Sequence, residues 1–288
     1  MLLFSVVLNG LVLGSILLLF SLGLTLIYGV GRVVNFAHGA LFSLGAFLGM
    51  ALSNSGLSFW TCLAVAPLLV AVAAVLFDWL VLARIRDRPM LDSLLMTFGL
   101  ALAITGGLYE AGARVVQVLQ VPDALKGTAT FLGASLPQYR IFVAMFSAAL
   151  MLLILLVLGR TRWGLRVRAA NDQPEMAACL GINRETLMHS VVGLSAALAA
   201  VSGVAAAPIT TVYGTVGDRY LILAFLTVII GGLGSLRGAI TAAYVVGMLV
   251  VLGEVYLGGQ MAMILLLMAV MVMLVRWPRG FFNEGRVE

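Results

Sequence analysis

The sequence carries little charge. Of its 288 residues, 17 are Lys or Arg and 12 are Asp or Glu, whereas 62% fall in the broad hydrophobic set. A soluble domain is about 25% charged and no more than about half apolar. So few polar side chains cannot cover the surface of a soluble domain of this size, and the soluble globular classes are therefore excluded.

Cysteines and enzyme motifs are also scarce. The two cysteines, Cys62 and Cys179, lie far apart in the sequence, which favours neither a disulfide framework nor a metal site. No GxSxG, HExxH or CxxC occurs, and the glycine-rich run 231–239 lacks the Lys-Ser/Thr pair of a phosphate loop. We therefore expect no catalytic residue, no metal, no cofactor and no ATP hydrolysis by this chain. The net charge of +5 does not indicate a nucleic-acid partner, because the charges lie between apolar segments.

Long apolar segments fill most of the chain. Stretches such as 11–27 and 63–77 are apolar on nearly every helical face, which a membrane helix tolerates, whereas barrel strands alternate apolar and polar residues. At roughly 20 apolar residues per crossing, the sequence predicts an all-α, polytopic transmembrane helix bundle with eight or nine spans, in one domain over residues 1–288. The predicted spans are 4–29, 36–54, 58–82, 91–110, 139–159, 187–208, 219–234, 239–257 and 260–276.

The distribution of positive charge predicts an orientation. With nine spans and the N-terminus outside, thirteen of the 17 cations fall on the inner side. Cytoplasmic loops carry an excess of Lys and Arg, so the basic connector 160–186 and the C-terminus are predicted to be cytoplasmic. No basic region precedes the first apolar run, so that run is expected to remain as a helix. The outer connector 111–138 is expected to form a short lid.

The connector 160–186 contains signals for a short helix. Asp172 and Glu175 have the spacing of a D-x-x-E capping box, Pro174 suits a first helical turn, and Gly181 suits a C-terminal stop. These signals predict a cytoplasmic helix over 173–180.

The predicted helix presents an apolar face formed by Met176, Ala177 and Leu180. An isolated helix of about two turns is marginal in water, so something must cover this face. A cytosolic partner and the protein's own bundle are equally compatible with the local sequence.

Two further stretches contain polar or flexible residues at membrane depth. Asn35 and His38 are three residues apart, a spacing that places them on one helix face, and Gly39 lets another backbone approach. They are candidates for a translocation path, although a histidine that ties two helices together is the commoner case. The glycine-rich run 231–239 is either a tight connection or a break inside one re-entrant element, and helix packing competes with a transport role there.

These stretches, in this order, resemble the inner-membrane permeases of branched-chain amino acid ABC importers, especially the LivH type. The resemblance extends from residue 28 to the C-terminal RWPRGFF, and NFAHG, RAANDQPEMAACLGIN and GGLGSLRGA carry it. In the E-A-A core of the family's coupling motif, Met176 replaces the middle alanine. Ala40 stands where many members have Glu, and Arg237 stands where many have Pro. Similar permeases also serve amide, urea and aromatic-acid importers.

The resemblance implies a permease in a bacterial inner membrane that works with several partners. These are a second related permease, two cytosolic ATP-binding subunits and a periplasmic solute-binding protein. It also implies that the short helix enters a cleft on the ATPase, so that Asp172, Glu175, Met176, Ala177, Leu180 and Gly181 couple ATPase motion to translocation. The alternative, from a different mechanistic class, is a passive channel or facilitator for a small polar solute such as urea or an amide.

Overall fold

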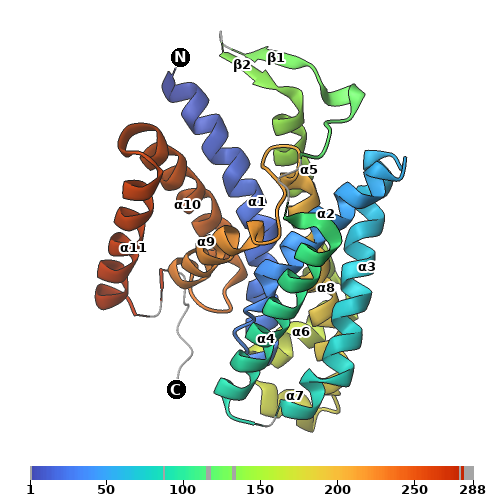
Figure 1. Ribbon diagram of the computed structural model, residues 1–288. Coiled ribbons are helices and arrows are strands. Elements are labelled where there is room, and N and C mark those ends of the chain that lie inside the picture. The colour runs from blue at the N-terminus through green and yellow to red at the C-terminus, as the bar shows by residue number, and fades with distance from the viewer. Residues whose placement is uncertain (1, 87, 115–117, 132–133, 279, 282–288) are drawn as a thin grey trace.

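The chain folds into a bundle of helices that run between two ends of the molecule. A computed structural model describes residues 1–288 except 1, 87, 115–117, 132–133, 279 and 282–288. The start of α1 (Leu2–Gly31) and a small β-hairpin lie at one end, and α6 (Arg162–Asp172) and α7 (Pro174–Cys179) lie at the other (Figure 1). Arg279 and Arg286, counted above among the inner cations, lie outside the described residues.

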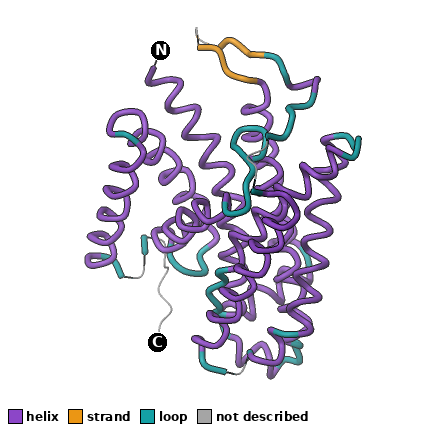
Figure 2. Tube along the Cα trace, viewed as in Figure 1, coloured by secondary structure: helices purple, strands orange, loops and turns teal. Residues whose placement is uncertain are grey.

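Helices make up nearly all of the regular structure (Figure 2), and the predicted all-α class is confirmed. The hairpin consists of β1 (Thr128–Phe131) paired antiparallel with β2 (Ala134–Pro137). A short helical turn at Leu82–Ile85 follows α3 (Phe59–Leu80), and another at Tyr109–Ala113 follows α4 (Met90–Leu108). A third, Asp123–Leu125, precedes the hairpin. The remaining helices are α2 (Ala37–Asn54), α5 (Gln138–Arg160), α8 (Arg184–Ala206), α9 (Val216–Gly231), α10 (Leu236–Leu257) and α11 (Gly259–Arg276).

The expected count of eight or nine spans is not confirmed. Seven helices within the described residues are long and apolar enough to cross a membrane, and α2 and α9 are not among them. With 16 residues, α9 is about 24 Å long at ~1.5 Å per residue, which is less than the ~30 Å of a hydrocarbon core. In α2, His38 and Asn54 reduce the apolar character of an 18-residue helix.

Small residues bring the central helices into close contact. The helix α8 packs against α1, α2 and α3, and α1 also packs along α10. A Cβ added at Gly203 of α8 would lie 2.2 Å from the carbonyl oxygen of Phe42, and one added at Gly45 would lie 2.4 Å from the Cα of Ala200. Small residues therefore allow close packing between α2 and α8.

Large apolar side chains cover the outside of the bundle. Examples on α4, α5 and α11 are Leu102, Leu152 and Val272, each more than half exposed. In water such a surface would be a liability, but in lipid it is the normal exterior of a helix bundle. The outer helices therefore present the face that a bilayer covers.

Candidate functional site

The polar segment after α5 folds into two helices rather than one. The helix α6 was not predicted from the sequence. It begins after Thr161, whose Oγ1 accepts a 3.0 Å hydrogen bond from the backbone N–H of Gly164. Trp163 Nε1 donates a 2.8 Å hydrogen bond to Ser190 Oγ on α8, so α6 is attached to the bundle by a side chain of α8.

The second helix, α7, matches the prediction closely but lacks the predicted cap. Its bounds Pro174–Cys179 lie within 173–180, and Pro174 occupies the first turn as expected. The capping box is wrong: Asp172 is the last residue of α6, and Gln173, the N-cap of α7, makes no side-chain cap hydrogen bond. An N-cap residue needs non-helical backbone angles, and Asp172 cannot adopt them because it continues α6.

The C-terminal stop of α7 is confirmed. Gly181 has φ +80°, its backbone N–H bonds to the carbonyl of Ala178 at 3.0 Å, and the N–H of Ile182 bonds to that of Ala177 at 3.1 Å. This pair of bonds is a Schellman motif, in which glycine takes the left-handed conformation at low cost.

The apolar residues of α7 are divided between two environments. Ala177 is only 3% exposed and joins the hydrophobic core of the bundle. Met176 and Leu180, four residues apart, are 60% and 81% exposed. The protein's own bundle therefore covers the alanine and leaves the two larger side chains on the surface.

The candidates near the start of α2 lie in three different settings. Asn35 precedes the helix and its Oδ1 accepts a 3.0 Å hydrogen bond from Ala37 N–H, so the expectation that it shares a helix face with His38 is wrong. His38 is fully buried; its Nε2 donates to the carbonyl of Phe20 at 2.9 Å and its ring stacks on Phe20. A Cβ on Gly39 would lie 3.0 Å from the carbonyl of Gly217 on α9.

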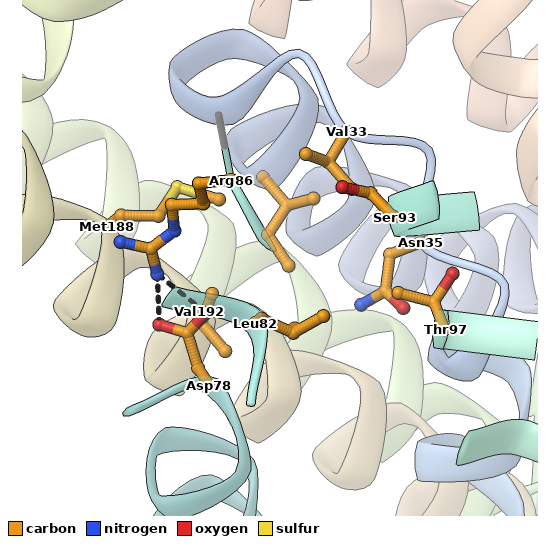
Figure 3. Close-up of a pocket in the computed structure, with 10 residues that line it drawn as sticks. Val33, Asn35, Asp78, Leu82, Arg86, Ser93, Thr97, Met188 and Val192 are labelled. Atoms are coloured by element: carbon orange, nitrogen blue, oxygen red, sulfur yellow. Dashed lines mark hydrogen bonds and ion pairs between the residues drawn. The ribbon is translucent and has the colours of Figure 1, made fainter. Parts of the chain in front are cut away.

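Asn35 lines a pocket that the sequence did not reveal. The pocket is small, with a cavity volume of about 30 Å³, and lies near the α6–α7 end of the bundle. Ser93 and Thr97 of α4 stand beside Asn35, while Asp78 and Arg86 face the pocket from the opposite wall (Figure 3). Of the three predicted path residues, only Asn35 contributes to this pocket.

A buried ionic cluster closes one wall of the pocket. Asp78, 1% exposed, accepts hydrogen bonds of 2.6 and 2.5 Å from Arg86 Nη2 and one of 2.6 Å from His189 Nδ1. The cluster joins α3 and the turn after it to α8, the helix that follows α7. Asp78 and Arg86 lie far from His189 in the sequence, and the three residues belong to no motif. An acid inside an apolar span needs a partner, and this was the available signal.

The glycine-rich run 231–239 forms a tight connection between α9 and α10. Gly232 and Gly234 have φ values of +94° and +85°. A Cβ on Gly238 would lie 1.8 Å from the carbonyl of Gly231, so the end of α9 and the start of α10 are in backbone contact. The run is therefore a tight turn that separates two helices.

Comparison with known proteins places this architecture in a family. Residues 6–276 match the family described as the permease component of branched-chain amino acid transport systems. The chain is 25% identical to the high-affinity branched-chain amino acid permease LivH of Salmonella typhimurium, and 24% identical to BraD of Pseudomonas aeruginosa. Each of these matches covers 97% of this chain and 95% of the relative.

The probable branched-chain amino acid permease LivH of Methanocaldococcus jannaschii is 30% identical over 83% of this chain and 77% of its own length. No solved structure matches the chain. These relatives are named as transport permeases, in agreement with the expectation that the chain is not an enzyme. The chain belongs to the family of permease components of branched-chain amino acid transport systems.

Proposed function

We propose that this protein is one transmembrane half of an ATP-driven importer for branched-chain amino acids or similar small amino-acid-like solutes. The observation that carries the proposal is the family match over residues 6–276, together with relatives named for branched-chain amino acid transport. The exposed residues of α7 add a physical reason for a partner, because two large apolar side chains stand uncovered on a short helix.

The charge distribution supports an orientation in the plasma (inner) membrane. Cations gather in and around α6, as in Arg160, Arg162, Arg166 and Arg168. By the positive-inside rule the α6–α7 end faces the cytosol. The N-terminus and the β-hairpin then face the periplasm, and the end of α11 returns to the cytosol. The hairpin and the turn before it then lie on the outer side, where we propose a short lid.

The helix α7 is the part of the chain that we propose meets the ATPase. Met176 and Leu180 make the apolar contact, and Glu175 and Asp172 offer carboxylates around it. Ala177 has a different role from the one first assigned, since it anchors α7 to its own bundle. Gly181 is the joint between α7 and α8.

Motion of α7 has a direct route into the bundle. The chain continues from Gly181 into α8, the most buried of the candidate spans, which carries His189 of the ionic cluster. Closure of two ATP-binding subunits would therefore displace α7 and α8 together and tilt the bundle from inward- to outward-facing. A second related permease and a periplasmic solute-binding protein complete the proposed assembly.

The coupling role predicts a specific defect in Glu175→Arg. This side chain lies at the start of an exposed helix, so reversing its charge should leave membrane insertion intact while breaking the contact with the ATPase. We expect ATP hydrolysis by the assembled complex to continue and solute uptake in proteoliposomes to fall about tenfold or more, as for loss of a charged contact.

The matched control is Glu110→Arg, an exposed acid at the opposite end of the bundle. This variant should take up solute like the parent. Unchanged uptake by Glu175→Arg would show that α7 is not the coupling element.

A further inference from the structure

We infer that a groove at the hairpin end of the bundle, between α1, α9 and α10, binds the α-ammonium and α-carboxylate groups of the transported amino acid through Glu254 and Arg219. The inference rests on the proposed function and adds to it the place and the chemistry of solute recognition on this chain.

The groove consists of two adjoining hollows that share three residues. Their cavity volumes are about 460 and 320 Å³, and both are lined by Arg219, Leu223 and Glu254. The other walls are mainly aliphatic, with Ile16 from α1 and Val251 from α10 among them. An aliphatic groove with a few charged groups has the composition of a small-ligand site, in which few polar groups fix the orientation.

The two charges are accessible. Arg219, in the first turn of α9, donates a hydrogen bond from Nη2 to Glu254 Oε1 in the last turn of α10. Their side chains are 60% and 36% exposed. A guanidinium has five N–H donors and a carboxylate has about four acceptor positions, so the single contact between them leaves most of this capacity for a ligand.

An irregular segment borders the same groove. Between Ala206, the end of α8, and Val216, the start of α9, nine residues are not helical, and Ile209 and Thr210 among them line the groove. Non-helical backbone inside a membrane bundle is tolerated where protein covers it or where it lines a water-filled cavity. Discontinuous helices of this kind commonly border transport sites.

A further polar contact lies along the same wall. Arg140, at the start of α5, donates from Nη1 to Asn9 Oδ1 on α1, and both residues line the groove. The groove therefore has two cations and one acid along one edge, an arrangement that favours a ligand with a carboxylate.

The charges and walls of the groove favour an amino acid over the other solutes compatible with the sequence, which are urea, amides and aromatic acids. A zwitterionic amino acid carries a carboxylate and an ammonium on one carbon, which suits an adjacent Arg and Glu, and an aliphatic side chain suits the walls. Urea and simple amides have no opposite charges to pair with either residue. An aromatic acid without an amino group could meet Arg219 but would offer no cation to Glu254, whereas a zwitterionic amino acid engages both residues.

The test uses the complete importer in proteoliposomes, with radiolabelled leucine delivered by the solute-binding protein. The variants are Arg219→Gln, Glu254→Gln and the double exchange Arg219→Glu with Glu254→Arg. We expect each single variant to lower the maximal uptake rate about tenfold or more, as for one lost charge-assisted hydrogen bond. The exchange restores the ion pair but reverses its direction, and it should not restore uptake.

The matched control is the exchange of Arg114 and Glu110, an exposed ion pair with side-chain exposures of 68% and 77% that lines neither hollow. It should transport leucine like the parent. Full uptake by the Arg219 and Glu254 exchange would show that the pair only joins two helices and would overturn the inference. Loss of permease pairing in the single variants would identify the groove as a subunit contact and would also overturn it.

Uptake by the unaltered complex tests the proposed function, whereas uptake by the variants tests the site. If it showed no ATP-dependent uptake of leucine, the proposed function would fail, and the ligand assigned to the groove would fail with it. If it transported leucine while the single variants did so at the same rate, only the site would be wrong.

Discussion

The two ends of the bundle hold ion pairs of opposite character. At the α6–α7 end, Asp78 is 1% exposed and is bonded by both Arg86 and His189. At the hairpin end, Arg219 and Glu254 are joined by one hydrogen bond and remain partly exposed, at 60% and 36%. Burying charge costs several kcal/mol per ion unless it is fully paired, whereas an exposed pair contributes about 0–1 kcal/mol. The buried cluster therefore holds helices together, and the exposed pair retains the capacity to meet a ligand.

The largest expected effect comes from removing the centre of the buried cluster. Asp78→Ala leaves Arg86 with no acid partner in a mostly buried position, 15% exposed. We expect a loss of about 3–5 kcal/mol in the free energy of unfolding. Thermal unfolding in detergent measures this loss. Glu110→Ala, an exposed acid, serves as control and should change stability by less than about 0.5 kcal/mol. Equal effects of the two variants would contradict the structural role of the cluster.

A smaller effect is expected at His189. His189→Ala removes one hydrogen bond to the buried carboxylate, a bond to a charged group worth about 1.5–3 kcal/mol. The amide of His189→Gln can still donate a hydrogen bond, so this variant should recover part of the loss. Unfolding of both variants in the same detergent checks this order. If both the His189→Ala and the His189→Gln variants were as stable as the parent, the buried cluster would not differ from the exposed pair in stabilising the fold.

The smallest effect on stability is expected at the exposed pair. Glu254→Gln should lower the free energy of unfolding by no more than about 1 kcal/mol, and the change should shrink further as salt is added. Unfolding midpoints at low and high ionic strength measure both quantities. If Glu254→Gln lowered the free energy of unfolding as much as Asp78→Ala does, at any salt concentration, the exposed pair would stabilise the fold as strongly as the buried cluster, which would contradict the comparison.

The parts of the fold that were predictable are those set by local sequence. Most apolar runs specify membrane helices by themselves, whereas the runs at α2 and α9 form helices that are not among the seven candidate spans. Pro174 and Gly181 mark the ends of α7 because proline fits a first turn and glycine fits a left-handed stop, whatever surrounds them. These signals need no knowledge of the rest of the chain.

The predicted cap of α7 is wrong because the local sequence around Asp172 is compatible with two different helix boundaries. Asp172 can either begin one helix or end another, and the choice depends on whether α6 forms. That helix is fixed by Thr161 and by the hydrogen bond from Trp163 to Ser190, which lies on a helix that begins after α7. The competing interaction is tertiary and could not be identified from residues 160–186.

The candidate site was only partly predictable for a similar reason. The buried cluster joins residues 78, 86 and 189, and the outer groove joins residues on α1, α9 and α10. Each of these residues is unremarkable in its own segment. Asn35, predicted for a translocation path, lines the pocket, whereas His38 and Gly39 pack against α1 and α9.

The central claim is that solute crosses this bundle only when an ATPase drives it. Leucine flux into proteoliposomes tests it most directly, with the permease pair alone and with the complete importer, and with ATP supplied on the α6–α7 side. The account predicts uptake only with the ATP-binding subunits, the binding protein and ATP all present. Steady leucine flux through the permease pair alone would contradict it and would identify a passive facilitator.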